Sequence, residues 1–267
     1  MARKRITSQS IEKLEAALDI NFDAAESAVF GVCDMQQNVI KRLKMTATGV
    51  YDTDEEPTIL IPERLEKLLY PKRLKIIYGG RGSGKTRTVT SILTERSRFR
   101  RERIACFREI QGSIKESSYQ EIIDEIERKG EFEEFRQVEG EISHKLTRSK
   151  FSFKGLYRNV TTVKGFAGAT IAWVEEAENI SQSSIDILEP TIRAEGSEIW
   201  LTFNPNKPTD AIWTNFVEPY LDKMQGGIYE DDDTLIIEVN YTDNPWFTAE
   251  LVSIHAPRAE RDISINS

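Results

Sequence analysis

The sequence predicts an α/β protein in which helices flank a mostly parallel β-sheet. From Ile59 onwards, short β-prone runs alternate with helical segments, which is the order that parallel strands with crossover helices produce. The run over residues 170–174 is continuously apolar after Thr170, as expected for a strand buried on both faces of a parallel sheet. With 267 residues, 39% of them hydrophobic, the chain is long enough to bury a sizeable core.

The predicted elements follow one another along the chain. Apolar spacing over residues 8–18 predicts a helix near the amino end, and the acidic, glycine-containing stretch 48–57 predicts an exposed linker. The predicted strands cover residues 74–78, 104–107, 170–174, 198–203 and 235–239. The predicted helices cover residues 85–99, 117–129 and 183–192, and a hairpin is predicted over residues 141–156.

Composition excludes several classes of protein. No apolar run approaches the roughly 18 residues that a membrane-spanning helix needs, and residues 1–5 are not followed by the apolar core of a signal peptide, so we expect a cytosolic protein. Cys33 and Cys106 lie far apart in sequence, which favours two reduced thiols over a disulfide framework. His144 and His255 lie near no cysteine pair, so we expect no zinc site.

Charge is distributed unevenly along the chain. The net charge of −8 argues at first against a nucleic-acid partner. Residues 64–108 nevertheless carry 14 Lys or Arg against 3 Glu, whereas residues 109–141 carry 11 acidic residues against 4 basic ones. Two solvated helix faces explain this pattern as well as a phosphate-binding face beside an acidic face does.

A glycine-rich motif of the form G-x-x-x-x-G-K-[ST] stands between the predicted strand 74–78 and the predicted helix 85–99. Its glycines let backbone N–H groups turn inward to cradle phosphates, and the helix N-terminus adds partial positive charge. We expect Lys85 to reach the β- and γ-phosphates of a nucleotide, and Thr86 to hold Mg²⁺ through its hydroxyl. The predicted binding residues are Gly79, Gly80, Arg81, Gly82, Ser83, Gly84, Lys85 and Thr86.

Polar side chains end two further predicted strands. Glu175 and Glu176 directly follow the apolar strand 170–174, where one carboxylate can hold the metal shell and the other can act as general base on water. The strand 198–203 leads to Asn204, and a polar side chain there can contact the γ-phosphate or the attacking water. An ordinary Asn-Pro turn that closes a strand explains this second site almost as well.

Six sequence blocks resemble the large terminase subunits of tailed phages, with the branch that contains the terminase of Shigella phage Sf6 as the most similar. They occur in the same order between about Ile59 and Phe247. The blocks are residues 80–86, 107–117, 173–178, 190–193, 199–205 and 239–245.

This resemblance implies a P-loop NTPase with a RecA-like core of the type that carries its catalytic glutamate beside an additional strand. It implies a ring of subunits on the phage portal in the host cytoplasm, using ATP and Mg²⁺ to drive double-stranded DNA into a procapsid, with a small terminase subunit as a further partner. In isolation the chain is expected to be a monomer.

The resemblance also assigns roles to residues. Glu175 is the metal-side acid and Glu176 activates water. Lys85 and Thr86 bind phosphate and Mg²⁺. Arg81 senses or stabilises the γ-phosphate. Thr202 and Asn204 match the coupling motif. Arg108 and Arg193 are candidates for an arginine finger supplied by a neighbouring subunit. Gln36 and Gln37 are candidates for contact with adenine.

Three points stay open at this stage. The stretch with Arg96, Arg98, Arg100, Arg101 and Arg103 suits DNA phosphates, the portal or a neighbouring subunit equally well. A helicase-like ATPase would share the chemistry but needs a second motor domain or strand-contact motifs, which we do not find. A nucleotide-regulated binding module would not need the paired glutamates.

The chain departs from the family pattern at both ends. We expect an extension and linker over residues 1–58, the motor domain over 59–250 and a tail over 251–267. Because the tail does not resemble the nuclease domain that follows in the family, we expect no DNA cleavage from this chain. Either the motor domain has been cut from a longer protein, or the nuclease is a separate polypeptide.

Overall fold

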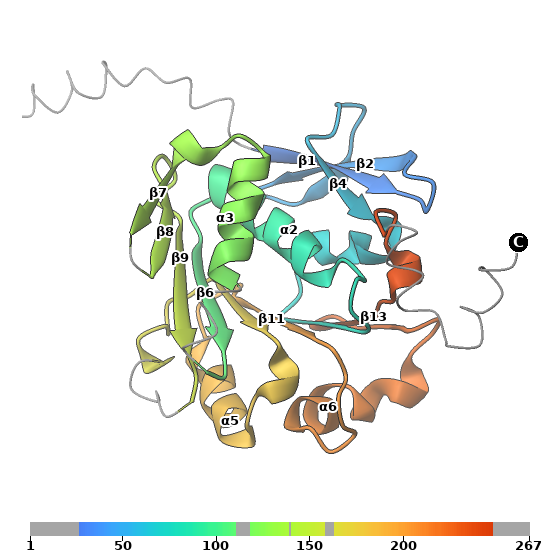
Figure 1. Ribbon diagram of the computed structural model, residues 1–267, viewed down its shortest axis with the longest axis vertical. Coiled ribbons are helices and arrows are strands. Elements are labelled where there is room, and N and C mark those ends of the chain that lie inside the picture. Colours follow the sequence, from blue (N-terminus) through green and yellow to red (C-terminus); the bar gives the residue numbers. More distant parts are fainter. Residues whose placement is uncertain (1–26, 111–117, 139, 158–162, 248–267) are drawn as a thin grey trace, which may run out of the picture.

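The computed structural model describes residues 27–110, 118–138, 140–157 and 163–247 (Figure 1). The helix expected over residues 8–18 and the whole of the expected tail lie outside the described residues. Within the described ranges, no helix is both long and apolar enough to cross a membrane. Cys33 and Cys106 are both buried and free, as expected.

A nine-stranded sheet forms the centre of the molecule, in the order β12-β13-β5-β11-β10-β6-β9-β8-β7. Neighbouring strands from β13 to β9 run parallel, and the strands at both edges pair antiparallel. The parallel strands are β13 (Thr234–Glu238), β5 (Leu74–Tyr78), β11 (Glu198–Phe203), β10 (Ile171–Glu175), β6 (Arg103–Arg108) and β9 (Lys150–Gly155). The antiparallel ones are β12 (Ile228–Glu230), β8 (Glu141–His144) and β7 (Phe135–Val138).

Strand β11 lies between β5, which leads into the glycine-rich loop, and β10, which ends in the paired glutamates. This is the additional-strand arrangement that the resemblance implied. In a parallel sheet the carboxyl ends of these three strands meet at one edge, where ligands of open α/β sheets bind. The topology therefore brings the loop, the glutamates and the end of β11 to the same edge.

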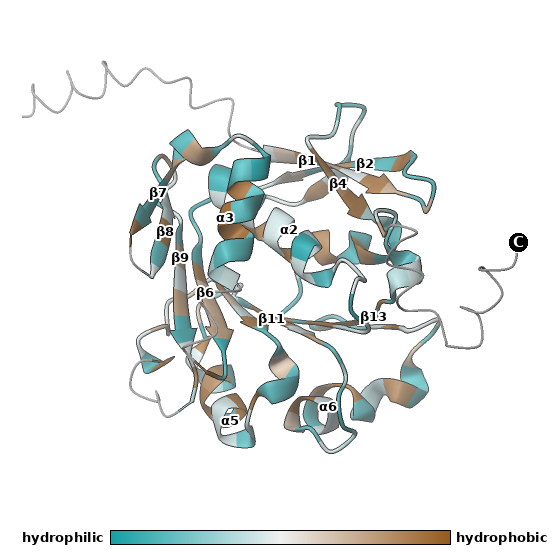
Figure 2. Ribbon diagram, viewed as in Figure 1, coloured by the Kyte–Doolittle hydropathy of each residue, from teal (hydrophilic) through white to brown (hydrophobic). Residues whose placement is uncertain are grey.

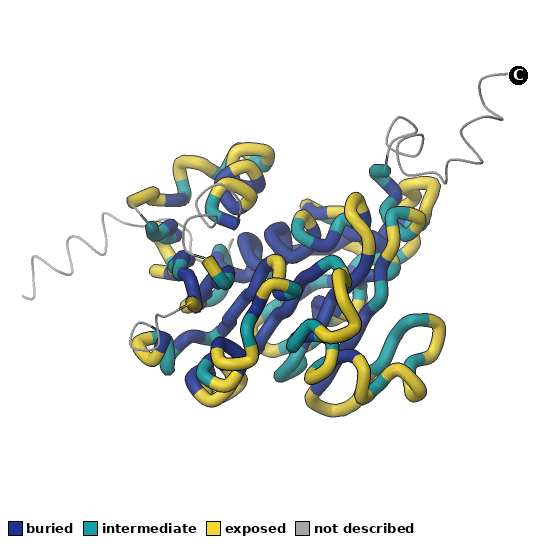
Figure 3. Tube along the Cα trace, turned by 60° about the horizontal axis from the view of Figure 1, so that its bottom comes forward, coloured by how far each residue is buried: buried dark blue, intermediate teal, exposed yellow. Residues whose placement is uncertain are grey.

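Helices cover both faces of the sheet (Figure 1). One face packs against α2 (Lys85–Phe99) and α3 (Ser118–Arg128), and the other against α5 (Gln182–Thr191) and α6 (Ala211–Phe216). Strand residues alternate between the two cores, because successive side chains point to opposite faces: Trp173 joins the first cluster and Val174 the second. Hydrophobic residues are concentrated along the central strands (Figure 2), which are also the most deeply buried part of the chain (Figure 3).

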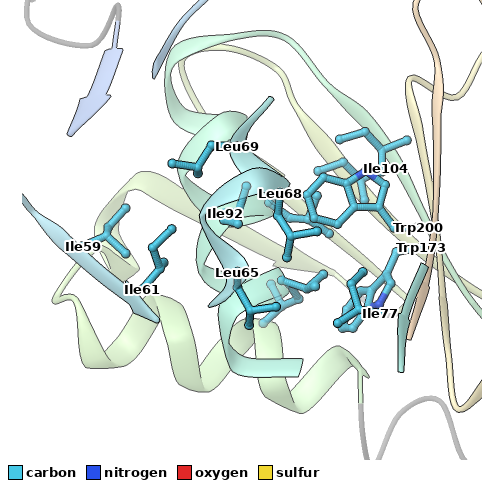
Figure 4. Packing of buried hydrophobic residues seen from close by; sticks show 14 of the residues in the cluster. Ile59, Ile61, Leu65, Leu68, Leu69, Ile77, Ile92, Ile104, Trp173 and Trp200 are labelled. Carbon is cyan, nitrogen blue, oxygen red and sulfur yellow. The ribbon is translucent and has the colours of Figure 1, made fainter. Parts of the chain in front are cut away.

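A second, four-stranded sheet precedes the main one, in the order β3-β2-β1-β4. Its strands are β1 (Ser27–Cys33), β2 (Val39–Thr46), β3 (Val50–Asp52) and β4 (Ile59–Pro62), followed by the 3₁₀ helix η2 (Glu63–Leu69). Figure 4 shows Ile59 and Ile61 of β4 and Leu65 and Leu68 of η2 packed around Ile92 of α2. No sequence pattern predicted this sheet, and the expectation of an exposed linker over residues 48–57 is wrong where β3 forms.

The other predicted elements are confirmed with small changes of boundary. The ranges of β5, α2 and β11 are those expected, and residues 141–144 and 150–155 form the two arms of the expected hairpin. Helix α6, the edge strands β7 and β12, and the remaining 3₁₀ helices, η4 (Phe132–Glu134), η5 (Ala177–Asn179), η6 (Glu218–Lys223) and η7 (Tyr241–Asp243), were not predicted.

Two arginines of the basic stretch are bound by acidic side chains of the chain itself. Arg96 is buried and pairs with Glu198 at 2.7 Å and with Glu102 at 3.0 Å. Arg98 pairs with Glu131 at 2.6 Å and with Glu134 at 2.9 Å, which ties α2 to the loop before β7. These two guanidinium groups stabilise packing between elements, so they are not available to an external phosphate backbone.

Candidate functional site

The glycine-rich loop connects β5 to the first turn of α2 in a conformation that only glycine allows at two positions. Gly79 has a φ of 148°, and a Cβ atom there would lie 1.7 Å from the carbonyl oxygen of Val239. Gly82 has a φ of 75°, and its Cβ would lie 2.2 Å from the ring of Phe247. Side chains at either position would clash with the segment that follows β13, so the loop path is fixed by backbone packing.

Lys85 is buried at the start of α2 and its ammonium is held from four sides. Its Nζ donates hydrogen bonds to the carbonyl oxygens of Gly79 and Gly80, both at 2.9 Å. It also donates to Ser83 Oγ at 2.9 Å and to Asn204 Oδ1 at 3.0 Å. Burial lowers the pKa of Lys85 to about 8, and the negative charge of Glu178 opposes this shift only in part. An anion beside this buried ammonium would favour its charged form.

An open pocket of about 320 Å³ lies at the carboxyl edge of the sheet, in front of Lys85. Ten predicted site residues line it, and three of them are Gly82, Ser83 and Gly84 of the loop. The other seven are Arg81, Lys85, Thr86, Glu175, Glu176, Thr202 and Asn204. Gly79 and Gly80 do not line the pocket; their carbonyl groups hold Lys85. Side chains from β10, β11 and the loop are thus gathered around one space, which is what the sequence predicted.

The carboxylate of Glu175 is fixed by two partners that the sequence analysis did not assign to it. Ser118, at the start of α3, donates a 2.5 Å hydrogen bond to Glu175 Oε2, and Arg108 Nε lies 3.2 Å from the same oxygen. Arg108 also reaches Glu176, with Nη2 2.7 Å from Oε1. One guanidinium group therefore bridges both carboxylates. Because Arg108 ends β6, the strand beside β10, its position could have been inferred from the strand order.

Glu176 occupies an unusual backbone conformation for a residue with a side chain. Its φ is 50°, in the left-handed region, at the point where β10 ends. Such a conformation costs about 1 to 3 kcal/mol and is found mostly where function requires it. Its side chain is 48% exposed, whereas that of Glu175 is 9% exposed. The turn thus directs one carboxylate to solvent in the pocket and keeps its neighbour in the wall.

Glu178 is a further acidic residue near Lys85. It belongs to a block that carried the family resemblance, but no role was expected for it. Its Oε2 is buried without a hydrogen-bond partner in the described part of the chain. Burial raises the pKa of Glu178, and the nearby Glu176 raises it further, while Lys85 acts in the opposite direction.

The two residues predicted to couple hydrolysis to the rest of the domain differ in what they contact. Thr202 is buried, and its hydroxyl accepts a 3.0 Å hydrogen bond from Trp173 Nε1. The same hydroxyl donates to the carbonyl oxygen of Val174 at 3.4 Å, which joins β11 to β10. Asn204 instead faces the loop through Lys85. Together they connect the glutamate strand to the glycine-rich loop.

The three arginines considered for phosphate contact lie in different places. Arg81 is exposed and lines the pocket. Arg108 is buried between its own chain's glutamates, which argues against the idea that it reaches into a neighbouring subunit. Arg193 is exposed beside Arg73 and Ser197, near the amino ends of β5 and β11, at the opposite edge of the sheet from the pocket.

The fold and the site together define a P-loop nucleotide-binding domain with a RecA-like sheet. The sequence model of the phage terminase large subunit matches residues 71–262, well over half of the chain. The chain therefore belongs to the phage terminase large subunit family, as the sequence resemblance indicated.

Solved structures of large terminases share this fold. The large terminase of a thermophilic bacteriophage has a TM-score of 0.55 at 13% identity, over 70% of this chain and 46% of that chain. The complex of the same terminase with ADP has a TM-score of 0.54 at 12% identity, over 70% and 46%. Its complex with ATP-gamma-S has a TM-score of 0.51 at 14% identity, over 70% and 45%. Our chain thus spans less than half the length of that phage protein. No curated protein sequence matches the chain.

Proposed function

We propose that this chain is the ATP-hydrolysing motor domain of a phage DNA-packaging terminase. The observation that carries the proposal is the pocket in which Lys85 and Thr86 of the loop face Glu175 and Glu176 of β10. A triphosphate needs a cation and a metal-binding hydroxyl on one side and an activated water on the other. Membership of the terminase family and the nucleotide complexes of the thermophilic phage terminase support this interpretation.

The nucleoside half of ATP would lie in a neighbouring pocket of about 400 Å³. Both pockets are lined by Gly84 and Arg87, so a nucleotide whose γ-phosphate faces Glu176 extends past Gly84 into the second one. Trp246 lines this second pocket, with the Arg87 guanidinium 5.9 Å from its ring centroid. An aromatic ring beside a cation offers a stacking surface to a purine.

Gln36 and Gln37, suggested from the sequence for adenine contact, do not line the second pocket. Gln37 Nε2 instead donates a 2.9 Å hydrogen bond to the carbonyl oxygen of Pro245, next to Trp246. We therefore assign Gln37 to supporting the segment that carries Trp246.

In the proposed mechanism Glu176 accepts the proton of the attacking water, and Lys85 and Arg81 neutralise charge on the γ-phosphate. The hydroxyl of Thr86 and the carboxylate of Glu175 line the same pocket and are oxygen donors of the kind that Mg²⁺ prefers. When bound, Mg²⁺ would draw charge from the phosphate oxygens. Asn204 holds Lys85 and exchanges this contact as the γ-phosphate arrives and leaves, which moves the end of β11.

The partners follow from the same proposal. We propose double-stranded DNA as the translocated substrate, the portal protein and the small terminase subunit as partners, and a ring of copies during packaging in the host cytoplasm. We also propose, from the order of the six sequence blocks, that the branch of Shigella phage Sf6 is the nearest within the family.

Steady-state ATPase assays with and without duplex DNA test the proposal. We expect Mg²⁺-dependent hydrolysis that the Lys85→Ala substitution abolishes by weakening ATP binding. A Trp246→Leu substitution should weaken ATP binding and also remove the change in tryptophan fluorescence on binding. If the unmodified chain binds ATP but releases no phosphate under any condition, a nucleotide-regulated binding module replaces the motor. If it displaces a strand from a DNA duplex, the helicase-like alternative replaces it.

A further inference from the structure

A further concave surface lies beside β7, β8 and β9, the last three strands at one side of the main sheet. Figure 1 shows these strands along one rim of the molecule. The cavity there has a volume of about 420 Å³. We call it the basic groove, and its five cationic residues, all exposed, are Arg101, Arg136, Lys145, Arg148 and Lys150.

Three of the five cations have no ion-pair partner among the described residues: Arg101, Arg136 and Arg148. The two lysines are paired, Lys150 with Glu141 at 2.9 Å and Lys145 with Glu133 at 4.0 Å. Arg96 and Arg98, by contrast, are each paired with at least two acidic side chains. Three guanidinium groups that face one groove repel each other, and an external anion would relieve that repulsion.

The turn between β8 and β9 supports the same conclusion. Arg148 lies in this turn with a φ of 63°, in the left-handed region. Glycine or asparagine would occupy this conformation with less strain. An arginine at that position places a long cationic side chain beside the groove and strains the backbone. Because the residue is exposed, packing does not require an arginine there.

The groove is separate from the nucleotide pocket. Arg101 precedes β6, and Lys150 begins β9, so both lie at the amino ends of parallel strands. The glycine-rich loop and the glutamates lie at the carboxyl ends. Substitutions in the groove are therefore expected to leave basal ATP hydrolysis unchanged.

The lining of the groove distinguishes between classes of partner. Val138 is the one hydrophobic residue among the described residues that line it, and the one acidic residue, Glu141, is paired with Lys150. Protein–protein interfaces usually contain an apolar centre, whereas interfaces with DNA are polar and strongly positive. Guanidinium groups bind phosphate oxygens in a two-pronged geometry without reading the base sequence.

We propose that the basic groove binds the phosphate backbone of duplex DNA. This inference rests on the proposed motor function, since it names the surface through which the domain contacts its DNA. It also explains how a chain with a net charge of −8 can bind a polyanion, because the contact is local.

Fluorescence anisotropy with a labelled duplex of about 30 base pairs, at salt concentrations between about 50 and 200 mM, tests the proposal. The variant carries Arg101→Gln, Arg136→Gln and Arg148→Gln. We expect its affinity to fall roughly tenfold or more, and the slope of log affinity against log salt to fall by about 0.9 for each phosphate that is no longer neutralised. A control carries Lys207→Gln and Lys223→Gln, two exposed lysines elsewhere on the chain, and should bind like the parent.

Basal ATPase activity, measured on the same proteins, separates the two proposals. Unchanged DNA affinity in the triple variant, with normal ATPase activity, overturns the groove assignment and leaves the motor function standing. A triple variant that binds DNA normally but loses self-association in sedimentation would assign the groove to a neighbouring copy instead. Absence of ATPase activity in the parent, with groove-dependent DNA binding, would overturn the motor function alone.

Discussion

The amide oxygen of Asn204, just after β11, accepts a 3.0 Å hydrogen bond from the ammonium group of Lys85 at the start of α2. This contact joins the end of one central strand to the phosphate-binding loop across the pocket. Since the same ammonium is the expected partner of the γ-phosphate, nucleotide binding and the position of β11 are linked through one atom.

Asn204→Ala should therefore impair hydrolysis more than binding. Lys85 keeps its contacts with Gly79, Gly80 and Ser83, so we expect the Kd for ATP to change less than about threefold. Loss of a hydrogen bond to a charged group is worth about 1.5 to 3 kcal/mol, so we expect kcat to fall roughly ten- to hundredfold. Asn206→Ala, in the same exposed loop, is the control. Equal kcat values for both variants would exclude a role for the Asn204 contact.

Arg108→Ala should destabilise the fold and also stop hydrolysis. The Arg108 and Glu175 side chains are each only 9% exposed, and removing one partner of a buried ion pair costs about 3 to 5 kcal/mol. Urea denaturation measures this loss. The control is Arg42→Ala, which breaks the exposed pair with Glu56 and should cost less than about 1 kcal/mol. A loss of stability no larger than in the control would show that Arg108 does not hold Glu175 in place.

ATP binding should weaken in alkaline solution. Burial lowers the pKa of Lys85 to about 8, and a bound triphosphate favours the ammonium form and raises that pKa again. Below pH 8, Lys85 of the free protein is already protonated. Above pH 8 it is mostly unprotonated, so ATP binding must be accompanied by the uptake of a proton. The Kd for ATP should then rise by up to about tenfold for each pH unit above 8. Calorimetry at several pH values measures this dependence, and a constant Kd between about pH 7.5 and 9.5 would refute it.

The elements that are bounded by glycine or built from apolar runs were the ones that the sequence predicted well. Glycines end β5 and lead into α2, and β11 is a mostly apolar run that ends at an Asn-Pro pair, so their boundaries agree with the structure. Strand β2 was missed because its exposed face carries lysine and arginine side chains that pair with neighbouring acids, and this hides the two-residue period. Such strands are stabilised by pairing with β1, a contact that no local pattern reveals.

The site was predictable in its residue types but not in its contacts. The glycine-rich loop, Glu175 and Glu176 follow from motifs at strand ends. The bridge from Arg108 to both glutamates depends on β6 lying beside β10, and the bond from Ser118 depends on where α3 begins. Neither relationship has a fixed sequence spacing, since the chain between these elements can vary in length without moving the strands.

The most direct test of the whole account compares ATP binding and ATP hydrolysis in the Glu176→Gln variant. Glutamine keeps the shape of the side chain but cannot accept the proton of the attacking water, and loss of a general base slows catalysis by about 10² to 10⁴. We predict a Kd for ATP close to that of the unmodified chain and a kcat at least about a hundredfold lower. Hydrolysis by Glu176→Gln at the rate of the unmodified chain would contradict the assignment of Glu176 and the proposed mechanism with it.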